Sequence, residues 1–194
     1  MSQFDIQAYG PEFAKVLDTD RRRPLDAGRP NAAARAALDK LTVDAAIAHA
    51  RVVDREMASC CVSGAWLLHD FLDESHRISQ EIETPEASFW HAIMHRREGD
   101  FSNAKYWFRR VGKHPVLDLV GQRAAEMGAV RGEERIVKKL ITGGAWDPMA
   151  FVDLCQAAVG GHGNERELCL DIQQAEWELL FDYCFKRAVA AESD

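Results

Sequence analysis

Hydrophobic residues recur every three or four positions along most of the chain, which is the spacing of an amphipathic α-helix. We find no run that alternates hydrophobic and polar residues between hairpin turns, the pattern typical of a β-strand. Helix start and stop signals, such as Thr84-Pro85 before a helix and Gly99 or Gly112 after one, divide the chain into about seven to nine helices. Residues 142–148 read as a loop. The pattern predicts an all-α protein, folded as a multi-helix bundle.

The predicted helices group into a single domain that covers residues 1–194. Residues 1–30 form a short helix followed by an arm that Pro and Gly interrupt. Residues 43–82 keep the helical pattern, with a break near Asp54, and belong to a functional core that we place at 43–115. The last helix, residues 165–190, carries a hydrophobic stripe wide enough to pack on several neighbours, so we expect it to lie centrally.

Composition narrows the class of protein. The formal net charge is −7 and the longest run of cations is the three arginines at 21–23, so we do not expect nucleic acid as a partner. The chain lacks an apolar run of about 20 residues, so no membrane span is expected. The first residues, MSQFDIQAYG, do not have the pattern of a signal peptide. Five cysteines without a C-x-x-C pair fit small buried side chains, and we expect a cytoplasmic protein.

Two neighbouring predicted helices carry the same polar spacing, i, i+4 and i+7, which puts three side chains on one face of each helix. In the first helix these are His69, Asp73 and His76, and in the second they are His91, His95 and Glu98. Two helices joined by a short connection are expected to be antiparallel neighbours. If the two polar faces meet, imidazoles and carboxylates converge as they do in the metal sites of helical bundles.

This arrangement predicts a site for a divalent transition metal, namely Zn, Fe, Ni or Mn, and a hydrolase acting on a small anionic substrate. The expected metal ligands are His69, His76, His91 and His95. Asp73 or Glu98 completes the ligand set and the other acts as general base, while Arg97 or Arg109 holds the substrate. Further side chains expected in the same pocket are Asp70, Asn103, Lys105 and His114.

Other interpretations use the same residues. The pocket could bind a small molecule without chemistry, or the helical surfaces could serve an interaction protein. In a purely structural interpretation each histidine is hydrogen-bonded to a carboxylate or a carbonyl, and Asp73 pairs with Arg77. The sequence leaves open the oligomeric state and the purpose of the arm.

The second half of the functional core resembles one tetratricopeptide helical hairpin. In that motif a glycine such as Gly99 turns the chain, Ala104 permits close helix contact and Phe108 fills the groove. We see no second copy at a period near 34 residues, so a local hairpin is expected rather than a repeat array. The resemblance makes Trp90 and Trp107 expected core residues.

Two resemblances to known families bear on function. His49 followed by His69-Asp70 is similar to the H…HD pattern of HD-domain phosphohydrolases, which are all-helical and metal-dependent, although the glycine that often follows HD is missing. The chain more closely resembles a bacterial protein family without known activity, through the stretches HDFLDESHRISQ and FWHAIMHRREGDFSNAKYWFRRVGKHP. This second resemblance implies one common surface for His69, Asp73, His76, His91, His95, Glu98, Asn103 and His114.

Overall fold

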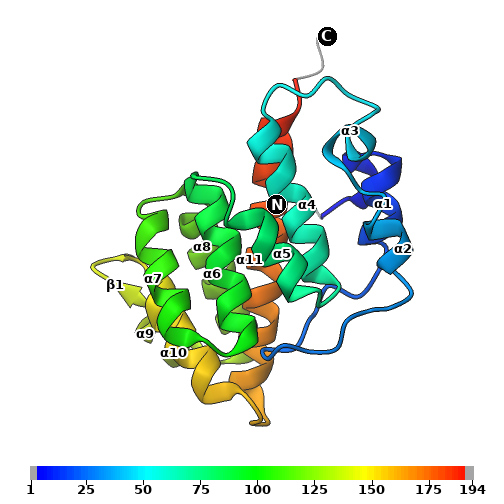
Figure 1. Ribbon diagram of the computed structural model, residues 1–194. Coiled ribbons are helices and arrows are strands. Elements are labelled where there is room, and N and C mark those ends of the chain that lie inside the picture. Colours follow the sequence, from blue (N-terminus) through cyan, green and yellow to red (C-terminus); the bar gives the residue numbers. More distant parts are fainter. Residues whose placement is uncertain (1–3, 191–194) are drawn as a thin grey trace.

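Helices make up nearly all of the regular structure in the computed structural model, which describes residues 4–190 (Figure 1). The all-α fold is confirmed. The eleven α-helices within these residues exceed the expected number, because the helical pattern expected at residues 43–82 is divided into three helices. The elements in chain order are η1 Ile6–Tyr9, α1 Pro11–Leu17, α2 Arg35–Leu38, α3 Val43–Ala46, α4 Arg55–Leu68, α5 Leu72–Ser79, α6 Pro85–Glu98, α7 Phe101–Val111, α8 Pro115–Arg131, α9 Glu134–Lys139, β1 Ile141–Thr142, β2 Ala145–Trp146, α10 Pro148–Ala158 and α11 Asn164–Ala188.

Helix α11 runs through the middle of the molecule, as its hydrophobic stripe predicted, and packs against α4, α8 and α10 (Figure 1). Its side of the core is aromatic: Trp177 donates its indole N–H to the carbonyl of Gly64 at 3.0 Å and stacks on Phe181. Helix α6 is tied to α11 by a fully buried ion pair between Arg96 and Glu176. The pair fixes how α6 is rotated, and therefore where its histidines point.

The helix signals around the functional core are confirmed. Thr84 caps α6 by accepting from the backbone N–H of Ala87, Pro85 occupies the first turn, and the helix ends at Gly99 in the left-handed conformation. Asp100 caps α7 in the same way. Helices α6 and α7 pack closely as a hairpin. Its likeness to a tetratricopeptide hairpin stays a prediction.

One long helix in our expectation is two helices in the structure. Helix α4 ends at Leu68 and α5 begins at Leu72, with Asp70 between them at φ 62°. A positive φ strains a residue that has a Cβ, so the turn needs support from elsewhere in the fold. The prediction that His69, Asp73 and His76 share one helix face is therefore wrong.

A small β-hairpin replaces part of the loop predicted at 142–148. Strands β1 and β2 pair antiparallel around Gly143-Gly144, both with positive φ, which is the turn geometry that fits the twist of two strands. The strands have only two residues each. That is too short for an alternating pattern to be visible in the sequence.

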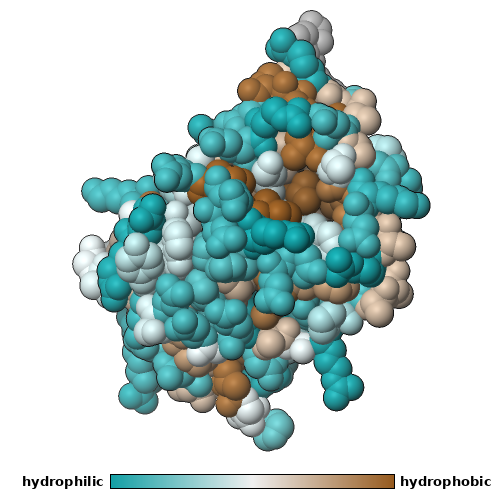
Figure 2. Space-filling view, viewed as in Figure 1, coloured by the Kyte–Doolittle hydropathy of each residue, from teal (hydrophilic) through white to brown (hydrophobic). Residues whose placement is uncertain are grey.

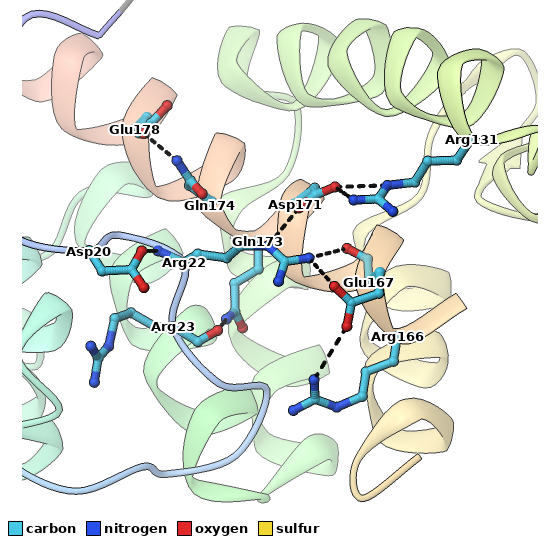
Figure 3. A network of polar contacts seen from close by, with 10 residues as sticks. All are labelled: Asp20, Arg22, Arg23, Arg131, Arg166, Glu167, Asp171, Gln173, Gln174 and Glu178. Atoms are coloured by element: carbon cyan, nitrogen blue, oxygen red, sulfur yellow. Dashed lines mark hydrogen bonds and ion pairs between the residues drawn. The ribbon is translucent and has the colours of Figure 1, made fainter. Parts of the chain in front are cut away.

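The arginine-rich arm is pinned along α11 by ion pairs (Figure 3). Arg22 contacts Glu167 and Asp171, both at 2.7 Å, and Arg131 of α8 binds the same Asp171. Gln173 donates to the backbone carbonyl of Arg23 at 3.0 Å. Arg21, which pairs with Glu178, and Arg22 therefore attach the arm to the acidic side of α11.

The visible face of the molecule is largely hydrophilic, and among the hydrophobic patches on it is one in a hollow where α4 meets the N-terminal helices (Figure 2). Within residues 4–190, none of the helices combines the length and the apolar character needed to cross a membrane.

Candidate metal centre

Three imidazoles converge between α5, α6 and α7. His76 comes from α5, and His91 and His95 come from α6, and one ring nitrogen from each lies within 4.8 Å of the other two. The ring centroids are 4.4 Å apart for His76 and His91, and 4.7 Å apart for His91 and His95. A tetrahedral zinc site with bonds of about 2.0–2.1 Å separates its nitrogens by about 3.3 Å, so modest ring rotations would close this cluster around an ion.

The sequence explains why these three rings meet. An i, i+4 spacing puts His91 and His95 one above the other on the same face of α6. The short connection between α5 and α6 brings the two helices into contact, and His76 lies one turn into α5 on the side that faces α6. Helices carry all three histidines, so the fold itself sets the geometry of the cluster.

His91 is the most deeply buried member of the cluster, with 2% of its surface exposed. Its ring stacks on the indole of Trp107, with centroids 3.9 Å apart, and its Nδ1 is buried without a hydrogen-bond partner among the described residues. Leaving such an atom unpaired costs about 1–3 kcal/mol. A metal ion bound at this nitrogen would remove that cost.

Burial also controls the charge of the cluster. It lowers the pKa of His91 to about 3, with smaller contributions from the neighbouring charges of His95, His76 and Arg110. The pKa of His76 is lowered for the same first reason, and then by His95. Metal ligands must be neutral imidazoles, so the site keeps these two rings in the state that coordination needs.

The outer edge of the cluster is acidic. His95 donates from Nδ1 to Glu98 Oε1 at 2.5 Å, which leaves Nε2 with its lone pair, the tautomer of a ligand supported by a carboxylate. The amide of Asn103 lies 3.0 Å from that Nε2 and donates to it, so an ion at His95 would displace this hydrogen bond. Asp100 forms a second possible ligand group with His95 and Glu98 on the exposed rim.

Trp107 and Asp100 are site residues that the sequence interpretation missed. Trp107 was expected in the core, and it covers His91 while remaining half-buried. A signal was present, because Asn103 and Trp107 repeat on α7 the i, i+4 spacing of His91 and His95 on α6. In a helical hairpin two such pairs are expected to face each other.

His69 lies outside the cluster. It ends α4, where its Nε2 is 2.7 Å from the carbonyl of Val16 and its Nδ1 is 3.1 Å from the amide of Asn31. Both ring nitrogens are therefore occupied by protein groups. The break at Asp70 turns His69 toward the N-terminal segment, which is why it does not join His91 as we expected.

Asp70 and Arg97 anchor the arm and are not part of the histidine cluster. Arg97 donates to Asp70 Oδ1 at 2.5 Å and to the carbonyl of Asp26 at 2.9 Å, and Arg23 binds the second oxygen of the Asp70 carboxylate. Gly28 passes so close that a Cβ there would lie 2.7 Å from this carboxylate. These contacts supply the support that the strained turn at Asp70 needs.

The remaining expected site residues are spread over different parts of the fold. Asp73 is exposed in the first turn of α5, Lys105 pairs with Asp153 of α10, and Arg109 lines a cavity on another side of α7. His114 caps α8 by accepting from the backbone N–H of Val116, and lies 3.4 Å from Glu86. The structure thus gathers His76, His91, His95, Glu98 and Asn103, and places the other expected residues elsewhere.

The depressed pKa of His91 predicts an acid-dependent loss of stability. Between its ordinary pKa of 6.5 and about 3, the unfolded chain takes up a proton at His91 and the folded protein does not, so stability falls as the pH falls through this window. His91→Gln removes that proton, and we expect it to make the slope of unfolding free energy against pH shallower by up to about 1.4 kcal/mol per pH unit. Urea titrations of the wild type and of His91→Gln from pH 7 to pH 4 measure the free energy of unfolding. The same dependence on pH in both proteins would contradict the expectation.

Comparison of the chain with models of protein families, with curated proteins and with solved structures found no match. The resemblances noted in the sequence therefore stay predictions, and the geometry of the histidine cluster is the feature that bears on function.

Proposed function

We propose that this protein binds a divalent transition metal through His76, His91 and His95. The observation that carries the proposal is the cluster itself: three imidazoles on rigid helices, one of them buried with an unpaired nitrogen. Glu98 would orient the His95 ring by accepting a hydrogen bond from its Nδ1, as a carboxylate does for a metal-binding histidine in many metal sites. Three nitrogen ligands without an inner carboxylate favour zinc, nickel or iron(II) over manganese.

The geometry supports metal binding better than hydrolysis. Three protein ligands leave a coordination position for water, and the second oxygen of Glu98 could act as a base there. Of the cations expected to hold a substrate, however, Arg97 anchors the arm and Arg109 lies on another face. Neither the cavity beside Arg109 nor the larger groove along α11 is lined by a cluster histidine.

A cytoplasmic location remains part of the proposal, and five free buried thiols are consistent with it.

Titration of protein made without a histidine tag and stripped with chelator tests the proposal. We expect Zn²⁺ or Ni²⁺ to bind at about one equivalent and to raise the melting temperature, because an ion at 100 times its Kd stabilises the native state by about 2.7 kcal/mol. Bound Co²⁺ should show the absorption bands of an ion that nitrogen ligands coordinate with low symmetry.

The matched control is the triple variant His76→Gln/His91→Gln/His95→Gln. It should fold and lose both the stoichiometric binding and the thermal shift. If the wild-type protein binds none of Zn²⁺, Ni²⁺, Co²⁺ or Fe²⁺ at about 100 µM, a concentration at which a Kd of 1 µM gives near-saturation, the proposal is overturned. Equal binding by the triple variant would overturn it as well.

A further inference from the structure

A second cavity lies on another side of α7, remote from the face that carries Trp107. It has a volume of about 380 Å³ and opens between the end of α7, the start of α8 and the β1–β2 hairpin with the first turn of α10. This volume falls within the range of ordinary small-molecule sites. Phe108, Leu117 and Met149 make much of the wall apolar, and the polar side chains in it are Arg109, Thr142, Trp146 and Asp147.

Arg109 is a cation without an ion pair or a side-chain hydrogen bond within residues 4–190, whereas its neighbours on α7 are engaged. Lys105 binds Asp153, and Arg110 lies over the Trp107 ring and reaches Tyr106. The one carboxylate in the cavity wall, Asp147, is already used. One of its oxygens accepts from two backbone N–H groups that open α10, and the other accepts from Thr142.

Trp146 supplies a second unsatisfied donor. Its side chain is buried, with 7% exposed, and its indole Nε1 has no hydrogen-bond partner among the described residues. An indole N–H can only donate, so this group is a donor left without an acceptor within residues 4–190. Across the mouth, Gly112 leaves open space where a Cβ would stand.

The larger groove along α11, with a volume of about 760 Å³, lacks such unsatisfied groups. Within it Arg21 pairs with Glu178 at 2.8 Å, Lys186 pairs with Asp182 at 2.7 Å, and Tyr9 donates to the same Asp182. Arg123 of the same groove pairs with Glu126, and Asp5 accepts from the backbone N–H of Gln7. The smaller cavity is the one whose donors still need an acceptor.

We propose that the cavity beside Arg109 binds a small organic carboxylate with an apolar body. The carboxylate would accept from the Arg109 guanidinium, and from the Trp146 indole after a small rotation of that ring, while the apolar part packs against Phe108, Leu117 and Met149. The site is separate from the histidine cluster. Trp107 and Arg109 are two positions apart on α7 and project about 200° from each other.

Calorimetry with phenylacetate as the probe tests this inference, and phenylacetamide serves as its uncharged analogue. Wild-type protein should bind phenylacetate saturably and bind the amide at least about tenfold more weakly, since a hydrogen bond to a charged group contributes about 1.5–3 kcal/mol. Arg109→Gln should weaken phenylacetate binding by at least about tenfold. Arg110→Gln, the matched exposed arginine next to it, should leave binding unchanged.

Two further measurements make the outcome decisive. Trp146→Phe keeps an aromatic side chain, although a smaller one, and removes the N–H, and it should weaken binding by about threefold or more. The triple histidine variant should bind phenylacetate like the wild type, which separates this site from the metal proposal. Absence of saturable binding at about 10 mM, or equal affinity in wild type and Arg109→Gln, would overturn the inference.

Discussion

Glu176→Ala is expected to lower the free energy of unfolding by about 3–5 kcal/mol, because it leaves the Arg96 guanidinium charged and unpaired in the core. Both side chains are 0% exposed, and Arg96 donates to the two Glu176 oxygens at 2.5 and 3.3 Å. Arg96 also lies over the ring of Phe151, 4.8 Å from its centroid. For a chain of this length the loss corresponds to a fall in melting temperature of about 6–20 °C.

Chemical denaturation followed by circular dichroism measures the effect, and two variants control it. Glu12→Ala removes an exposed pair with Lys15 and should cost less than about 1 kcal/mol. Arg96→Met/Glu176→Leu removes both charges and should recover most of the lost stability, since a well-packed apolar pair can replace a buried ion pair. A loss below about 1 kcal/mol for Glu176→Ala would mean that the pair does not hold α6 against α11.

The second large expected effect is on metal affinity. His76→Gln should weaken Ni²⁺ or Zn²⁺ binding by at least about 100-fold. Loss of a residue that only hydrogen-bonds to a metal ligand already lowers metal affinity by about 10–100-fold, and His76 is proposed to bind the ion directly. His76 is only half-buried, so its replacement should leave the apo protein folded. His162→Gln, an exposed histidine in the loop before α11, is the matched control and should bind like the wild type.

Trp107 gives this experiment a local readout. Its ring stacks on His91 at 3.9 Å, so a paramagnetic ion in the cluster should quench its fluorescence. Trp107→Phe should keep most of the affinity and lose most of the quenching. If His76→Gln binds as tightly as the wild type, or if the quenching is unchanged in Trp107→Phe, the ion does not sit among these three rings.

Much of the candidate site could be predicted locally. The i, i+4 spacing of His91 and His95 and the Thr84-Pro85 start signal lie within a few residues of each other, and helix geometry alone converts them into a shared face. His76 was expected at the same site because a short connection makes α5 and α6 neighbours. The pairing of Glu98 with His95 at i+3 follows from the same periodicity.

The placement of His69 shows what local pattern could not supply. The hydrophobic spacing continues through residues 66–72, yet the helix stops at Leu68 and Asp70 takes a positive φ. The cause lies far away in the sequence: Arg23 and Arg97 hold the Asp70 carboxylate, and Gly28 leaves room for it. A pattern read over neighbouring residues contains no information about such distant partners.

The sequence by itself determined the all-α class, the helix starts at capped prolines, the central place of the last helix and the shared face of His91 and His95, because each follows from spacing along one helix or from a signal at its end. Only the tertiary structure decided which imidazole joins that face, which cations remain free and where the arm lies. Those outcomes depend on contacts between segments far apart in the sequence, such as Arg22 with Asp171, which are 149 positions apart, and on the burial that these contacts create.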